Sequence, residues 1–220
     1  MTMAKKVLIT VSAAILLMVI VLIAVTLSYM RGPDLTKYEY LKEPQISQKA
    51  DQKMLQVEAT GDPNTAAVKA FAILFKTYYQ NVKARGMVAP RARWPKPFDT
   101  PKEQWVGQYG LPVPETVVKI ENNPQQPGYP VSLTVWQYGE VAEILHTGPY
   151  STEGATMEKL KAFVAAAGYQ FSGPHEEEYL RGPGMFGRGD PNKYSTIIRY
   201  RVEPIPAETP QTKGRGKTTK

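Results

Sequence analysis

The sequence repeats one short pattern: a strand-like run ends in a Thr-Gly turn and leads into a helix. The first copy is residues 53–63 (KMLQVEATGDP), and the second, 87 residues further along, is residues 140–150 (EVAEILHTGPY). Strand, helix, strand, strand, twice over, predicts an α+β fold in which two βαββ units form an antiparallel sheet with both helices on one face. The further strand-like runs that support this prediction are residues 92–98, 104–113, 130–138, 169–180 and 194–202.

Both predicted helices carry an apolar stripe at the spacing of an α-helix. Gly86 and Gly168 stand where the two stripes end, and glycine is common just after a helix C-terminus. Ser151 or Thr152 is in place to cap the second helix. The stripe residues are Val68, Phe71, Phe75, Tyr78 and Val82 in the first helix, and Met157, Leu160, Val164 and Ala167 in the second.

Residues 7–27 form an uncharged apolar run (VLITVSAAILLMVIVLIAVTL). At about 1.5 Å per residue, a helix of this length spans about 30 Å, the thickness of the hydrocarbon core of a bilayer. A buried core helix would show a polar face, and a cleaved signal peptide has a shorter apolar region followed by a small-residue cleavage site. We therefore expect an uncleaved, single-pass transmembrane anchor over residues 1–30.

The basic residues on the two sides of this run predict its orientation. Lys5 and Lys6 lie closer to the run than Arg31, Lys37 and Lys42, and no acidic residue accompanies them. The positive-inside rule then places the N-terminus in the cytoplasm and the soluble part on the outer side of the membrane.

The remaining chain divides by composition. We expect a polar linker over residues 31–48, one folded domain over residues 49–204 with halves 49–115 and 116–204, and a disordered basic tail over residues 205–220. The tail is rich in Pro, Thr, Gly and Lys and has no apolar period, so it cannot bury enough surface to offset its ordering entropy.

Composition excludes several classes of function. Of the net charge of +7, residues 205–220 carry +3 and residues 1–40 carry +2, which leaves +2 for all the rest. The middle of the chain therefore has no basic stripe to follow a phosphate backbone, and we expect no nucleic-acid partner. The absence of cysteine excludes thiol nucleophiles, disulfides and Cys-ligated metals, and two histidines offer little for a His-rich site. We expect no metal and no cofactor.

The second half of the chain resembles the GyrI-like superfamily of small-molecule-binding domains, also known as gyrase-inhibitor-like or AraC-type effector-binding domains. The residues that carry the resemblance are His146-Thr147-Gly148-Pro149-Tyr150, Gly168-Tyr169, Gly173-Pro174, the Glu177-x-Tyr179 strand and Asp190-Pro191. It is good over residues 131–204 and weaker over 49–130. The resemblance implies a duplicated βαββ fold with a ligand cleft between the halves, and a ligand-facing glutamate at the position of Glu177. In this family the domain serves in transcription regulators, in stand-alone binders and in some hydrolases.

Alternation along residues 169–180 places Glu177 on the same face as His175 and Tyr179, with Glu176 and Glu178 on the other. A carboxylate on an apolar face must be paired, be neutralised or meet a ligand. The predicted ligand-binding residues are Glu177, Tyr179, Tyr150, Trp136 and Trp105, with Trp94, Tyr109 and Tyr138 as further aromatic candidates for the walls.

Each of these residues also has a purely structural interpretation. Glu177 can instead lie at a solvent-exposed rim or pair with Arg199 or Arg201 on the last strand. Each aromatic residue, taken alone, is more often part of a core than of a binding site. His146, just before a helix, is expected to be a structural hydrogen-bonding residue.

The leading hypothesis is a membrane-tethered domain that binds an amphipathic, aromatic or cationic small molecule. A second hypothesis is a small-molecule hydrolase in which Glu177 is the general base and Tyr150 or Tyr179 orients the electrophile. A third is an interaction or scaffold protein with a vestigial cleft and a partner in the cell envelope.

Overall fold

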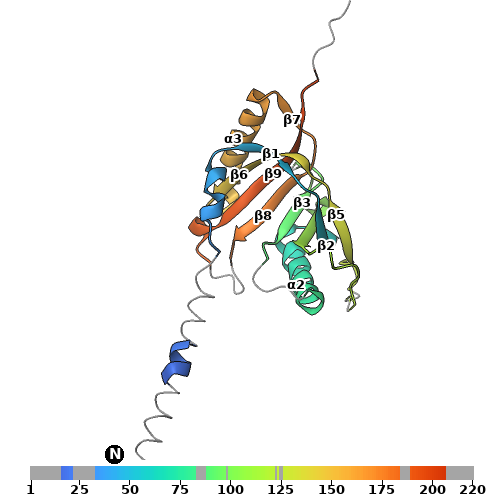
Figure 1. Ribbon diagram of the computed structural model, residues 1–220. Coiled ribbons are helices and arrows are strands. Elements are labelled where there is room, and N and C mark those ends of the chain that lie inside the picture. The colour runs from blue at the N-terminus through green and yellow to red at the C-terminus, as the bar shows by residue number, and fades with distance from the viewer. Residues whose placement is uncertain are drawn as a thin grey trace, which may run out of the picture. The chain divides into compact units, whose positions relative to one another are not determined.

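The computed structural model (Figure 1) describes residues 16–21, 33–82, 88–97, 99–121, 123, 126–183 and 189–206 of the 220-residue chain. The chain forms two compact units, Met1–Lys37 and Tyr38–Lys220. In the first unit, residues 16–21 are helical and exposed. Most of the predicted anchor, residues 7–27, lies outside the described residues, as do residues 207–220 of the predicted tail. Among the residues that are described, no helix combines the length and the apolar character needed to cross a membrane.

In its described residues, the second unit is built on an antiparallel sheet of nine strands with two α-helices. The order in the sheet is β1-β6-β9-β8-β3-β4-β2-β5, and the short strand β7 pairs with β9. The strands are β1 (Gln45–Lys49), β2 (Gln52–Thr60), β3 (Arg91–Trp94), β4 (Val106–Pro112), β5 (Val131–Trp136), β6 (Gly139–Thr147), β7 (Tyr169–Phe171), β8 (His175–Arg181) and β9 (Ser195–Pro204). The helices are α2 (Pro63–Asn81) and α3 (Glu153–Ala166), and the 3₁₀ turns are η1 (Thr36–Lys42), η2 (Lys102–Gln104), η3 (Tyr150–Thr152) and η4 (Pro191–Lys193).

The strand order confirms the predicted α+β fold and shows the duplication directly. The first half contributes β2-α2-β3-β4 in sequence and the second contributes β6-α3-β8-β9. In the sheet, β3-β4-β2 of the first half matches β8-β9-β6 of the second, and the halves meet where β3 pairs with β8. The fold is therefore two like units joined edge to edge.

The sheet curls back on itself because two long stretches of chain pair in a single register. Gln45 lies opposite Glu143, and Val57 lies opposite Val131. The second pair is twelve residues forward along one stretch and twelve residues back along the other, so the register is the same. The first pairing joins β1 to β6 and the second joins β2 to β5, so the two ends of the strand order are connected through the chain itself. The backbone N–H of Tyr138 donates to the carboxylate of Asp51 (2.9 Å) where these stretches bend.

Both helices pack on the outer face of this curled sheet. Helix α2 begins at Pro63, with Asp62 as its N-cap accepting from the N–H of Asn64 (2.9 Å), and buries Ala70 and Leu74 against the first half. Helix α3 buries Leu160 and Val164 against the second half. In Figure 1 the two helices cover different parts of the sheet, as a helix on each βαββ unit requires.

The inner face of the sheet carries a row of alternating charges. Directly opposed residues on β3, β8, β9 and β6 are Arg93, Glu176, Arg199 and Glu143. Arg199 is 2% exposed and pairs with three carboxylates: Glu143 (Nε to Oε1, 2.5 Å), Glu178 (3.0 Å) and Glu176. Opposite charges at opposed positions stabilise an antiparallel pair.

The two arginines of β3 carry this row across the junction of the halves. Arg93 Nε donates to Glu176 Oε2 (2.7 Å), and Arg91 Nε lies 3.1 Å from Glu178 Oε2. The hydroxyl of Tyr138 donates to Glu176 Oε1 (2.8 Å). We call Arg91, Arg93, Glu143, Glu176, Glu178 and Arg199 the inner ion network.

The structure differs from the sequence prediction in three local features. Residues 45–49 form β1, although the sequence predicts a linker over residues 31–48. The single strand predicted over residues 169–180 is broken at residues 172–174 into β7 and β8, which pair with different parts of β9. Finally, the face that carries Glu176 and Glu178, predicted to be the polar one, is buried: these residues are 2% and 7% exposed, because the curled sheet encloses its inner face.

Replacing Arg199 by methionine should destabilise the fold strongly. The change leaves three buried carboxylates without their shared partner, which should lower the free energy of unfolding by about 3–5 kcal/mol. Arg201→Met is the matched control, since Arg201 is exposed on the same strand and the same face; it should change the free energy by less than about 0.5 kcal/mol. Chemical denaturation of the full chain measures both values, and equal unfolding curves for the two variants would contradict a structural role for the network.

Candidate functional site

Glu177 lies in the middle of an apolar row on the outer face of the sheet. Residues directly opposed across neighbouring strands are Val131, Val57, Tyr109, Ala92, Glu177, Ile198 and Ile144. Glu177 is the one carboxylate in this row and is only 9% exposed. Its strand β8 is at the junction of the two halves. Glu177 therefore lies between the part of the sheet covered by α2 and the part covered by α3.

Two neighbours on the same strand hold the Glu177 carboxylate. His175 Nε2 lies 2.8 Å from Oε1, and the hydroxyl of Tyr179 donates to Oε2 (2.5 Å). The other ring nitrogen of His175, Nδ1, is 2.8 Å from the hydroxyl of Tyr200 on β9. Burial by itself would raise the pKa of Glu177, but the hydrogen bonds from His175, Tyr179 and Trp94, together with the charge of His175, hold it below its usual value.

Aromatic rings from both halves surround this carboxylate. Phe71 of α2 packs edge-on against Tyr179 (ring centroids 6.0 Å apart) and Tyr109 (5.3 Å), and Trp94 packs against Tyr109 (5.7 Å). On the side of the second half, Tyr150 of η3 packs against Tyr179 (5.8 Å). Tyr150 is 40% exposed, whereas Trp94 and Tyr109 are buried, so Tyr150 is the outermost of these rings.

A second buried carboxylate, Glu153, faces Glu177 from the first turn of α3. It is 8% exposed, and its Oε1 atom finds no hydrogen-bond partner among the described residues. Burial, with the negative charge of Glu177 adding to it, raises the pKa of Glu153 to about 8. The N-terminus of α3 favours the charged form, but burial outweighs it.

Two further buried hydroxyl groups on the outer face lack hydrogen-bond partners among the described residues. Tyr109 Oη and Thr196 Oγ1 are buried and, like Glu153 Oε1, make no hydrogen bond to the described part of the chain. Burial, together with nearby acidic or phenolic groups that include Glu177, raises the pKa of Tyr109, Tyr150 and Tyr200. The neutral phenols are therefore the stable forms, and they can donate hydrogen bonds.

The structure brings together only part of the predicted binding set. Glu177, Tyr179 and Tyr150 form one cluster, and Trp105 borders it through Trp94 (5.6 Å between ring centroids), with its indole N–H donating to Thr100 O (2.5 Å). Trp136 is not brought to Glu177. It lies on the inner face, where its indole N–H donates to Gln56 (2.6 Å) and its ring lies 4.2 Å from the guanidinium of Arg93.

Trp136 is on the inner face because of register. Trp136 lies opposite Gln52 on β2. Gln52 and Val57 are an odd number of residues apart on this strand, so their side chains point to opposite faces, and Trp136 shares the inner face with Gln52. Tyr138, another aromatic candidate, is also on the inner face, where its hydroxyl donates to Glu176 of the inner ion network. Neither of the alternative partners proposed for Glu177 is used either, since Arg199 pairs with Glu143, Glu176 and Glu178 instead.

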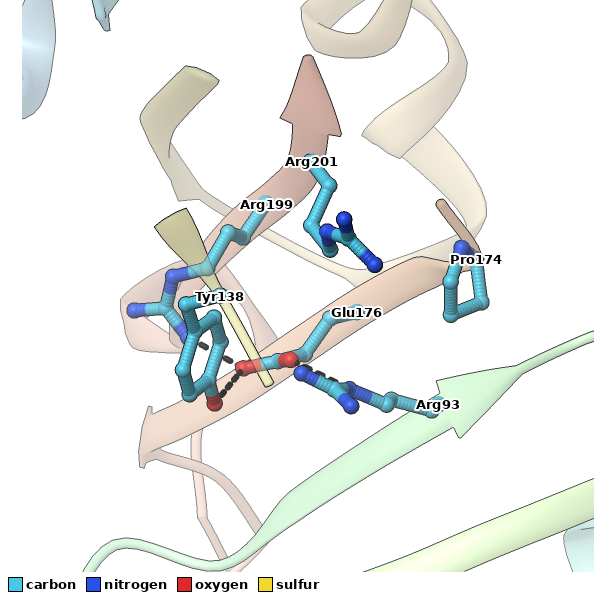
Figure 2. A pocket seen from close by; sticks show the side chains of 6 residues that line it. All are labelled: Arg93, Tyr138, Pro174, Glu176, Arg199 and Arg201. Atoms are coloured by element: carbon cyan, nitrogen blue, oxygen red, sulfur yellow. Dashed lines mark hydrogen bonds and ion pairs between the residues drawn. The ribbon is translucent and has the colours of Figure 1, made fainter. Parts of the chain in front are cut away.

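A hollow of about 170 Å³, part of it open to solvent, lies on the inner face, away from Glu177. Figure 2 shows that Glu176 occupies its middle, between the guanidinium of Arg93 and that of Arg199, with Arg201 and Pro174 at one side. Hydrogen bonds and ion pairs within the protein already engage Arg93, Glu176, Arg199 and Tyr138. The lining residues are Arg93, Tyr138, Pro174, Glu176, Arg199 and Arg201.

Comparison with known proteins settles the family. The model of the GyrI-like small molecule binding domain matches residues 42–201, which is most of the chain and includes both βαββ units. The chain belongs to the GyrI-like family. Comparison with curated proteins gives no significant sequence match.

Solved structures share this GyrI-like fold at low sequence identity. An uncharacterized conserved protein from Listeria innocua matches with a TM-score of 0.62 at 21% identity, over 77% of this chain and 99% of that chain. A hydrolase from Listeria innocua matches with a TM-score of 0.60 at 20% identity, over 79% and 100%. The EcmrR C-terminal domain matches with a TM-score of 0.54 at 11% identity, over 74% and 98%. At these identities, the likeness concerns the fold alone.

Within the GyrI-like domain, His146 positions the start of α3. Its Nδ1 is 2.9 Å from Thr156 Oγ1 and its Nε2 is 3.2 Å from Pro149 O. Gly148, between them, has a φ of 135°, a conformation that residues with a Cβ rarely adopt. This turn sets the positions of Tyr150 and Glu153 over Glu177.

Sequence reasoning missed the roles of Glu153 and His175. Alternation places His175 beside Glu177, and that is a signal which the pattern offered. Glu153 gives no such signal, because its approach to Glu177 depends on how α3 packs on a strand more than twenty residues further along the chain.

Glu153 should make the protein less stable as the pH rises. Its pKa is about 8 in the folded protein against 4.5 as the ordinary value, so between these values the folded state binds one proton more than the unfolded state. The free energy of unfolding therefore falls as the pH rises from about 4.5 to about 8. Glu153→Gln removes this dependence and should be more stable than the wild type at pH 8 by on the order of a few kcal/mol, with little difference at pH 5.

Denaturation curves at several pH values measure this difference. Glu158→Gln, an exposed change on the same helix, is the control and should follow the wild type throughout. Parallel curves for the wild type and Glu153→Gln would show that Glu153 ionises as readily in the folded protein as in the unfolded chain.

Proposed function

We propose that this GyrI-like domain binds an amphipathic aromatic cation at Glu177. The observation that carries the proposal is a buried, ionised carboxylate that is enclosed by aromatic rings and has no arginine or lysine in an ion pair with it among the described residues. A cation would pair with this carboxylate, whose present ion-pair partner is His175, and the rings of Trp94, Tyr150 and Tyr179 would supply cation–π and stacking contacts. Sites for small molecules are mostly apolar with a few placed polar groups, as here.

In this proposal the ligand reaches Glu177 from the side of Tyr150. This ring is the exposed member of the shell, and behind it Tyr179 covers Glu177 with its hydroxyl bonded to the carboxylate. A ligand that reaches Glu177 must displace both rings and replace the Tyr179 hydrogen bond. The buried groups without partners, Tyr109 Oη and Thr196 Oγ1, are on the same face and can bond to polar atoms of the ligand.

Thermal unfolding of the full chain in a mild non-ionic detergent tests this proposal with a panel of lipophilic aromatic cations, quaternary amines and neutral analogues. A ligand at about 100 times its Kd adds about 2.7 kcal/mol, which raises Tm by several degrees in a domain of this size. We expect cations to raise Tm in the wild type and in the control Glu158→Gln, and not in Glu177→Gln.

Two outcomes would contradict this proposal. If neutral compounds raise Tm equally in the wild type and in Glu177→Gln, the charge of the glutamate does not contribute to ligand recognition. A cooperatively unfolding protein that no compound stabilises would favour the interaction-protein hypothesis.

Hydrolysis is the second candidate function. Its support is the contact of Glu177 with both His175 and Tyr179, and the name of a fold neighbour from Listeria innocua, a hydrolase. In this mechanism Glu177 takes a proton from water while Tyr179 or Tyr150 hydrogen-bonds the electrophile. Turnover of strained electrophiles, such as epoxides, lactones or cyclopropanes, that disappears in Glu177→Gln would favour hydrolysis over simple binding.

We further propose that residues 7–27 tether this domain to a membrane, with the N-terminus in the cytoplasm. The support is the uncharged run of 21 residues and the position of Lys5 and Lys6 before it. The full chain should stay with the membrane pellet after alkaline extraction, and a chain that starts at residue 33 should be released. Release of both would contradict the tether.

The orientation can be tested because the chain has no cysteine of its own. Glu158→Cys introduces one thiol at an exposed position of α3. A membrane-impermeant maleimide should label this thiol in intact cells if the domain lies on the outer side. Labelling only after lysis would place the domain in the cytoplasm.

A further inference from the structure

Three side chains aim metal-binding atoms at one point beside Glu177. Each of Glu153, His175 and Glu177 offers one ligand atom, and these atoms all lie within 4.8 Å of one another. They come from the first turn of α3 and from alternate positions on β8, so two well-ordered elements hold them. All three are nine-tenths or more buried.

The hydrogen bonds around these groups leave the right atoms facing inward. Tyr200 engages Nδ1 of His175, and Tyr179 engages Oε2 of Glu177, so that Nε2 and Oε1 face each other across 2.8 Å. Metal-ligating histidines almost always have a partner on the other ring nitrogen, and ligating carboxylates are in turn hydrogen-bonded. Tyr200 and Tyr179 occupy these supporting positions.

Glu153 gives an independent indication of a missing ligand. Its Oε1 atom is buried and has no hydrogen-bond partner in the described part of the chain, although a buried carboxylate oxygen is costly to leave unpaired. Neither Glu153 nor Glu177 forms an ion pair with lysine or arginine among the described residues, in contrast to Glu143, Glu176 and Glu178 on the inner face. Once Glu153 releases its proton on metal binding, two ionised carboxylates and one neutral imidazole balance the charge of one divalent cation.

We propose that Glu153, His175 and Glu177 bind a divalent transition-metal ion, with Zn²⁺ as the ion that best fits one imidazole nitrogen and two carboxylate oxygens. Ligand atoms at about 2.0–2.2 Å from a metal lie about 3.0–3.5 Å from their neighbours. The contact between His175 and Glu177 has to widen by a few tenths of an ångström, and the Glu153 carboxylate has to move inward by about 1 Å. Three protein ligands leave a further position for water or a ligand atom.

This inference is separate from the proposed binding of an organic cation. Both use Glu177, but only the metal site requires Glu153 and the nitrogen of His175 as ligands. A bound metal ion and an organic cation would compete for the Glu177 carboxylate. Each is therefore measured in the absence of the other.

The test is titration calorimetry on the full chain, stripped with EDTA and then dialysed free of the chelator, with Zn²⁺, Mn²⁺ and Mg²⁺. We expect one Zn²⁺ per chain, bound more tightly than Mn²⁺ and much more tightly than Mg²⁺. Glu153→Gln should weaken Zn²⁺ binding at least tenfold, and Tyr200→Phe, which removes the support of His175, should weaken it by about 10- to 100-fold. Glu158→Gln is the matched control and should bind as the wild type does.

Spectroscopy of the Co²⁺-loaded protein reports on the ligands themselves. The visible absorption bands of Co²⁺ should appear in the wild type and Glu158→Gln and be lost or shifted in Glu153→Gln and His175→Gln. Zn²⁺ binding that is unchanged in Glu153→Gln and Tyr200→Phe, or no binding of any of the three ions by a cooperatively folded wild type, would overturn the metal site. Organic cations that still stabilise the stripped wild type and not Glu177→Gln would in that case leave the proposed function standing.

Discussion

The fold depends on one buried interaction, the contact of Arg199 with three carboxylates on the inner face of the sheet. Arg199 on β9 holds Glu143 of β6 and Glu176 and Glu178 of β8, and Arg91 and Arg93 extend the network over β3 into the other half. Because side chains alternate along a strand, a slip of β8 by one residue would turn Glu176 and Glu178 outward and Glu177 inward. The inner ion network therefore fixes the register that presents Glu177 to the helices.

The two faces of the sheet treat buried carboxylates in opposite ways. On the inner face, guanidinium groups hold the charges and hold the pKa of Glu178 below its usual value despite burial. On the outer face, Glu177 accepts hydrogen bonds from His175, Tyr179 and Trp94 and forms no ion pair with arginine or lysine among the described residues, and Glu153 is left with an unpartnered oxygen. A carboxylate that is paired with arginine contributes to structure, whereas one enclosed by aromatic rings remains able to accept a cation. The second environment is the one suited to binding.

Much of the fold could be predicted from local patterns, and the site only in part. The repeated Thr-Gly turn and the apolar stripes predicted the strands and helices of both βαββ units. The pattern gave no sign of β1, because Gln45–Lys49 is a polar segment that becomes a strand only by pairing with β6. Trp136 was predicted to bind ligand because it is aromatic and lies in the second half, but the register in which β5 pairs with β2 turns it to the inner face. The inner ion network exists because β3, β8 and β9 are neighbours in the sheet, which no single strand shows.

The sequence by itself determined which residues share a face with Glu177, since alternation along one strand is a local property: His175 and Tyr179 follow from the pleat alone. It also determined that two similar units are present, and that a long uncharged run precedes them. Only the tertiary structure decided what stands opposite Glu177. Glu153 faces Glu177 from α3, and Tyr150 of η3 and Phe71 of α2 pack on Tyr179, its hydrogen-bond partner. That approach depends on the pairing of β3 with β8 and on how each helix packs on the sheet. Contacts between segments so far apart in the chain arise from packing, which no pattern within a single segment contains.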